Sequence, residues 1–132
     1  MIKFKDLQIG GIILAEYEGQ QMEGVIKDIN RQDNAACVET DVQEFWFKPD
    51  DLHAIPLSEE QLMKLNFEKK VDDDSSIKYI KGAFRVFLPE KDNFSRLEIW
   101  YREDRRHLHQ PISVHELQNH YLQMTKVNLS RN

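Results

Sequence analysis

The sequence has little cysteine, little glycine and no long apolar run. Its one cysteine, Cys37, excludes an intrachain disulfide. The apolar run AACV around it predicts a buried small side chain rather than a reactive thiol. The longest apolar run, residues 12–15, is far shorter than the roughly 20 residues that span a bilayer. The N-terminus also lacks the apolar stretch of a secretory signal, so we expect a cytoplasmic protein with no membrane partner.

Charge is spread unevenly along the chain. The net charge is −5 at pH 7, from 18 basic and 23 acidic residues. Residues 1–66 carry 6 basic and 13 acidic residues, whereas residues 67–132 carry 12 and 10. Proteins that hold nucleic acid by its phosphates generally present a basic face. The first half therefore argues against nucleic-acid binding, and the second half leaves it open as an alternative.

The first half predicts short strands separated by turns. In the first strand we expect Ile12, Leu14 and Tyr17 to face inward, and we expect Gly24 to mark a bulge or bend in the second. The order of elements predicts a five-stranded Src-homology-3-like small barrel over residues 1–57. The predicted elements are strands at 12–18, 22–29, 35–40 and 44–48, a helical turn at 48–52 and a closing strand at 53–55.

The second half predicts a helix, a β-meander and a last helix. Ser58 and Gln61 form a capping box before the first helix, and Ser113 and Glu116 form one before the last, which ends near Lys126. We expect these elements to pack against the barrel as residues 58–132 of one compact α+β unit. The last helix has a predicted buried stripe of Val114, Leu117, Tyr121 and Met124. Predicted strands lie at 67–71, 77–81, 83–88 and 94–102, with a possible extension at 107–110.

Three segments resemble a known family. They are residues 6–13 (DLQIGGII), 55–70 (IPLSEEQLMKLNFEKK) and 113–129 (SVHELQNHYLQMTKVNL). Together they resemble a family of small uncharacterised proteins of bacterial genomes and mobile elements. His120 stands where that family usually has Leu, and Lys126 where it often has Gly. The resemblance implies a shared fold, and it implies no activity.

Aromatic residues gather in the segment 44–47. Phe45 and Phe47 share one face of the expected strand, and Trp46 points the other way. We treat Phe45, Trp46, Phe47 and the nearby Asp50 as a candidate protein-binding site, since exposed aromatics on small barrels often bind peptides. The equal alternative is that the rings belong to the core. A basic peptide would suit the nearby carboxylates Glu16, Glu18, Asp41, Glu44, Asp50 and Asp51.

An arginine-rich segment suggests a second kind of partner. Trp100, Arg102, Arg105 and Arg106 combine a stacking ring with guanidinium groups, which suits single-stranded nucleic acid. Acidic neighbours interrupt the segment and would cancel much of its field, so an ordinary solvated hairpin is favoured. These neighbours are Glu98, Glu103 and Asp104.

Histidines and helix polar groups give weaker candidates. His107 and His109 would share a strand face and could bind one metal ion, with His115 or Glu116 as a third ligand. However, no established metal-ligand spacing is present, and the neighbouring arginines would repel a cation. His115, Gln118 and Asn119 share a helix face as a polar cluster, and internal hydrogen bonding is favoured over ligand binding.

The acidic run at residues 72–74 lacks the glycine and the glutamate of a calcium loop, so we expect a flexible solvated turn. We expect no cofactor, no metal and no catalytic residue. The leading interpretation is a non-enzymatic binding or accessory protein with a protein partner or self-association. Single-stranded nucleic-acid binding is the alternative.

Overall fold

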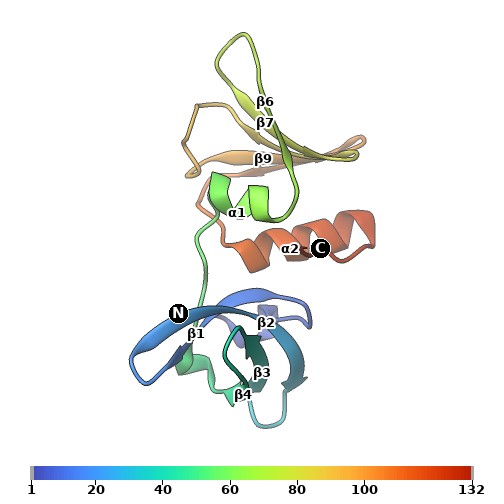
Figure 1. Ribbon diagram of the computed structural model, residues 1–132. Helices are drawn as coiled ribbons and strands as arrows, with labels where there is room; N and C mark the ends of the chain where they lie inside the picture. Colours follow the sequence, from blue (N-terminus) through green and yellow to red (C-terminus); the bar gives the residue numbers. More distant parts are fainter. Residues whose placement is uncertain (1, 132) are drawn as a thin grey trace. The chain divides into compact units, whose positions relative to one another are not determined.

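The computed structural model describes residues 2–131, which form two compact units (Figure 1). The first unit comprises the chain up to Ile55 together with Ser113–Asn119, and the second comprises Pro56–Ile112 together with the chain from His120 onward. Each unit holds one antiparallel five-stranded sheet. With two α-helices beside these sheets, the α+β prediction is confirmed.

The sheet of the first unit has the order β4-β3-β2-β1-β5. Short 3-10 turns precede β1 and β5, at Phe4–Asp6 and Pro49–Asp51. Strands β4 and β5 stand at the two ends of the order, and no pairing between them closes the sheet within residues 2–131. The strands are β1 (Ile12–Tyr17), β2 (Gln20–Asn30), β3 (Ala35–Thr40), β4 (Glu44–Phe47) and β5 (Leu52–His53).

The inward face of β1 differs from the prediction. Ile13 and Ala15 lie in the core cluster of the first unit, whereas Leu14 is half-buried and Tyr17 is exposed. Ile12 is buried as well, so both faces of this strand are covered at its start. A strand that is covered on both faces shows no clean alternation of apolar and polar residues. The sequence pattern therefore could not identify the side of β1 that faces the core. The remaining core comes from Ile2, Leu7, Ile26, Ala36, Val38, Phe47 and Leu52.

Gly24 serves close packing rather than a bulge. It pairs in register with Ile13 and Thr40, and the register shift of β2 lies three residues further on, between Ile26 and Asp28. A Cβ atom on Gly24 would stand 2.6 Å from Cγ1 of Val38, which real Cβ atoms do not tolerate. Gly24 therefore marks no bulge, and its lack of a side chain is what the packing needs.

The sheet of the second unit is a meander in the order β10-β9-β8-β7-β6. The predicted extension of this sheet at 107–110 is confirmed for residues 107 and 108, which end a separate strand, β10, that begins at Asp104; residues 109 and 110 lie beyond it. Arg102 adopts a left-handed φ of 57° and turns the chain within two residues, so Tyr101 pairs with Asp104. The strands are β6 (Glu68–Val71), β7 (Ile77–Lys81), β8 (Phe84–Leu88), β9 (Leu97–Tyr101) and β10 (Asp104–Leu108).

Both α-helices begin at the predicted caps. Helix α1 (Glu59–Lys64) starts where the Ser58 hydroxyl accepts the backbone N–H of Gln61 at 3.3 Å. Helix α2 (Val114–Thr125) has a reciprocal box, in which Ser113 N–H donates to Glu116 Oε1 at 2.9 Å and Glu116 N–H donates to Ser113 Oγ at 3.4 Å. Among residues 2–131, no helix has both the length and the apolar character that a membrane crossing requires.

Candidate functional site

Strand β4 exposes two of its three aromatic rings. Phe45 is 42% exposed and Trp46 is 51% exposed, on opposite faces of the strand. Phe47 is only 6% exposed, because it pairs with Ala36 and lies in the core cluster. Asp50 is exposed in the turn that follows. Phe47 is therefore not part of an exposed surface, whereas Phe45, Trp46 and Asp50 are accessible to a partner.

A second aromatic ring extends the surface around Phe45. The centroids of Tyr17 and Phe45 lie 5.4 Å apart with the rings tilted by 58°. Next to this pair, Val42 is 72% exposed. A hollow of about 300 Å³ lies beside them and is lined by Tyr17, Glu18, Gln20, Met22, Val42 and Gln43. We call Tyr17, Val42 and Phe45, together with Trp46 on the opposite face of β4, the β4 surface.

Carboxylates surround Trp46 on its own face of the sheet. Trp46 stands opposite Cys37 in register, and the Cys37 side chain is buried. Burial raises the pKa of the Cys37 thiol, and the negative charges of Glu44, Asp28 and Glu39 raise it further. The thiol therefore stays protonated, as expected for a structural cysteine. Glu44 precedes Trp46 by two positions, Glu39 pairs with Glu44, and Asp28 pairs with Cys37. The register therefore places these three carboxylates on the side of the sheet that carries Trp46.

The second sheet carries a row of aromatic and basic side chains, which we call the Trp100 row: Lys78, Phe87, Trp100 and Arg105. The rings of Phe87 and Trp100 are stacked with centroids 4.9 Å apart. The Arg105 guanidinium lies 4.4 Å from the Trp100 centroid, and Lys78 Nζ lies 5.5 Å from it. Trp100 Nε1 donates to Glu98 Oε1 at 2.9 Å. The ring of Trp100 is therefore already engaged by its neighbours.

The predicted arginine group is not a single surface. Arg106 follows Arg105 on the strand and so points to the opposite face, where its Nη1 lies 2.7 Å from His120 Nδ1 and donates to Gln123 Oε1 at 2.9 Å. Arg102 lies over the Tyr101 ring at the hairpin turn. Of the four residues proposed for nucleic acid, the structure brings only Trp100 and Arg105 together.

The polar cluster on α2 holds the N-terminal segment. The Gln118 side chain accepts the backbone N–H of Ile12 at 2.8 Å and donates to the carbonyl of Gly10 at 3.0 Å. Asn119 Nδ2 donates to the carbonyl of Asp6 at 2.8 Å. His115 is buried with Nδ1 3.1 Å from Ser113 Oγ, and burial lowers the pKa of its imidazole. These contacts support the reading of the cluster as internal hydrogen bonding.

His107 and His109 line one hollow of about 280 Å³ at the end of the second sheet, together with Arg96 and Glu98. His115 belongs to the other unit. Within the described part of the chain, no group of three or more histidine, cysteine or acidic side chains is arranged to hold a metal ion. The hollow is thus bordered by one arginine and one carboxylate as well as by two imidazoles, and these side chains are not arranged as a set of metal ligands.

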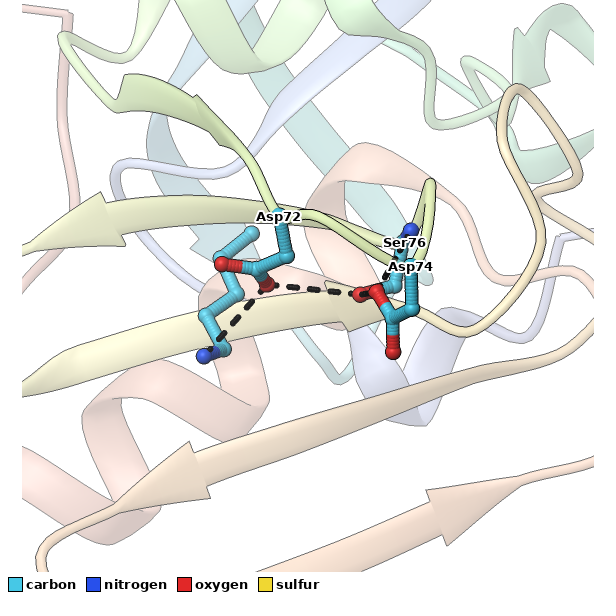
Figure 2. Close-up of polar contacts among 4 residues, drawn as sticks. Asp72, Asp74 and Ser76 are labelled. Atoms are coloured by element: carbon cyan, nitrogen blue, oxygen red, sulfur yellow. Dashed lines mark hydrogen bonds and ion pairs between the residues drawn. The ribbon is translucent and has the colours of Figure 1, made fainter.

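The acidic run forms an ordered turn between β6 and β7 (Figure 2). The Ser76 hydroxyl lies 2.6 Å from Oδ1 of Asp74 and 3.3 Å from Oδ2 of Asp72. Ser76 N–H also donates to Asp74, and these bonds lower the pKa of that carboxyl. Lys78 Nζ lies 3.4 Å from Asp72 Oδ2. Asp72 and Asp74 are therefore engaged in internal contacts that fix the turn.

The comparisons with known proteins add no relative to this description. No protein-family model, no curated protein and no solved structure matches the chain.

Proposed function

We propose that this chain is a non-enzymatic binding module that recognises another protein through the β4 surface. The observation that carries the proposal is the exposure of four large apolar side chains on the first unit: Val42, Trp46, Phe45 and Tyr17, at 72, 51, 42 and 41%. Tyr17 and Phe45 are in ring contact on one face of β4, Trp46 is exposed on the opposite face, and exposed apolar patches mark interaction surfaces more often than isolated side chains do. Aromatic rings also dominate the energetics of protein interfaces.

The architecture of the first unit suits this role. Four antiparallel strands, a 3-10 turn and a short fifth strand beside the first strand follow the order of a Src-homology-3-like small barrel. We include that finer fold assignment in the proposal. The sheet of the first unit presents its end strand β4 and its loop tips on a rigid support, which is how many binding modules hold their contact residues.

Affinity capture followed by reconstitution tests the proposal. The tagged full-length chain is used to capture a partner, which is identified, purified and titrated against variants. If Trp46 is an interface anchor, Trp46→Ala weakens binding by about 30-fold, the equivalent of about 2 kcal/mol. Met63→Ala, which removes another exposed apolar side chain in the second unit, is the matched control and leaves the affinity unchanged.

The result that contradicts the proposal is equally specific. If a reconstituted partner binds the Trp46→Ala and Phe45→Ala variants as tightly as the parent chain, the β4 surface is not the binding site. Circular dichroism of each variant shows whether a loss of binding reflects unfolding instead.

The nucleic-acid alternative has less support. A base needs an open ring face to stack on, whereas Trp100 is already stacked on Phe87 and covered by Arg105. Anisotropy of a labelled oligothymidylate at low salt separates the two functions. We expect no binding. Salt-dependent binding that is weakened by Arg105→Ala would favour the nucleic-acid function instead.

A further inference from the structure

In the described part of the chain, residues 2–131, strand β4 has a neighbouring strand on only one of its two edges. The strand lies at the end of the sheet order and pairs with β3 on one side only. Within residues 2–131, no strand pairs with its other side. An unpaired edge presents a row of backbone N–H and C=O groups that can pair with another chain.

The register shows which residues offer these groups. Thr40 N–H donates to the carbonyl of Gln43 at 2.8 Å and closes the β3–β4 hairpin. Since hydrogen-bonded and non-hydrogen-bonded pairs alternate along an antiparallel ladder, Phe45 and Phe47 turn their backbone groups toward β3. Glu44 and Trp46 then turn their N–H and C=O groups outward.

The usual protections of an edge are weak on this strand. Natural edge strands are blunted by lysine, proline or bulges. Strand β4 is short, at four residues, but it contains no lysine, proline or bulge, and its only charge is Glu44. It also carries one exposed aromatic ring on each face, Phe45 and Trp46, so a strand added here would find an apolar contact on either side.

The negative charge around this edge favours a basic partner. Glu44 stands directly opposite Glu39 on β3, and like charges in that position destabilise a sheet. Lys27 lies 3.6 Å from Glu39, but no ion pair involves Glu44 in the part of the chain that the structure describes. A lysine or arginine from outside would neutralise Glu44 and relieve the repulsion.

We propose that the outer edge of β4 binds an extended basic segment of a partner protein, which pairs with the backbone of Glu44 and Trp46 as an added strand. The inference rests on the proposed function and specifies its partner. A second copy of the chain is a poorer occupant, because it would bring its own Glu39, Asp41 and Glu44 toward the same carboxylates.

Amide hydrogen exchange of the isotope-labelled full chain tests the inference. The probe is a blocked peptide of alternating lysine and valine, with an alternating glutamate and valine peptide as its control. The amides of Glu44 and Trp46 point outward, so saturating basic peptide is expected to slow their exchange by about tenfold or more. The amides of Phe45 and Phe47 already bond β3 and change little. The acidic peptide has no effect on any of the four.

A matched pair of variants separates backbone pairing from charge. Glu44→Ala and Glu44→Pro both remove the carboxylate, but only proline removes the outward N–H. We expect Glu44→Pro to bind the basic peptide about tenfold more weakly than Glu44→Ala does, the loss expected for one backbone hydrogen bond. A lysine–valine peptide that is N-methylated on alternate residues should bind as weakly, while circular dichroism confirms that both variants are folded.

Three results would overturn the inference. If the basic peptide binds without slowing the Glu44 and Trp46 amides, the partner docks by side chains alone and the proposed function stands without strand addition. If the basic peptide does not bind, or the acidic one binds equally, the partner class is wrong. If hydrogen exchange of these two amides slows as the protein concentration rises in the absence of peptide, the occupant of the edge is a second copy of the chain. The capture experiment with Trp46→Ala tests the proposed function independently of these three results.

Discussion

The side chain of Gln118 accepts the backbone N–H of Ile12 at 2.8 Å across 106 positions of sequence. The side-chain amide of Gln118 also donates to the carbonyl of Gly10 at 3.0 Å. One side chain thus satisfies two polar groups of the backbone that leads into β1. Both partners of the shorter bond are buried. This side chain therefore attaches the start of α2 to the first strand of the same unit.

Removal of this amide should destabilise the fold. Gln118→Met keeps the length of the side chain but leaves the Ile12 N–H buried without a partner, which costs about 1–3 kcal/mol. Urea unfolding measures the loss. Gln123→Met makes the same chemical change on an exposed position of α2 and should cost less than about 1 kcal/mol. Equal losses in the two variants would show that the Ile12 bond adds no stability.

The free energy of unfolding should decrease as the pH is lowered, because of His115. Burial lowers the pKa of this imidazole from 6.5, against smaller opposing effects of Glu116 and Asp6. Below pH 6.5 the unfolded chain binds a proton that the folded chain does not, so the free energy of unfolding decreases as pH falls toward the lowered folded pKa. The slope from one proton reaches at most about 1.4 kcal/mol per pH unit.

The variant His115→Gln should flatten this pH dependence between pH 7 and 5. Urea unfolding at successive pH values provides the slopes, whatever the absolute stability of the variant. His109→Gln removes an exposed histidine and serves as the control. If His115→Gln retains the slope of the parent chain, a different group titrates.

Helix α2 should gain stability from glycine at its C-terminus. Lys126 adopts a φ of 63°, and its N–H donates to the Leu122 carbonyl at 2.9 Å. Glycine adopts this left-handed conformation without strain, so Lys126→Gly should raise the free energy of unfolding by about 1 kcal/mol. Lys126→Ala also removes the lysine side chain but keeps Cβ, and should show no such gain. A loss of stability in the glycine variant would contradict the expectation.

Gly24 should not tolerate a methyl group. A Cβ atom there would lie 2.6 Å from Val38 Cγ1 and 2.7 Å from the Glu39 carbonyl oxygen. Gly24→Ala should therefore cost about 1–3 kcal/mol by overpacking. Part of that cost should disappear in a Val38→Ala background, since truncation removes the Cγ1 contact and leaves the backbone one. Strictly additive losses in this double-mutant cycle would show that the contact with Val38 contributes nothing to the cost.

The short-range elements of the fold were predictable. The helix starts follow from Ser58 with Gln61 and from Ser113 with Glu116, because a cap needs only a hydroxyl and an amide three residues apart. Strands 35–40 and 77–81 were found at their observed bounds, since their apolar residues are flanked by polar turns. The polar cluster of α2 was also found, although its backbone partners were not.

The tertiary structure alone decided which side chains are accessible. Phe45 and Phe47 share a strand face, yet one is exposed and the other lies in the core, because only the latter position is covered by the rest of the unit. The alternation rule places Arg105 and Arg106 on opposite faces, but it does not say that one covers Trp100 and the other contacts α2. Sequence spacing fixes the side of a strand on which a residue lies. Burial depends on what distant segments place over that side, and this requires the folded chain.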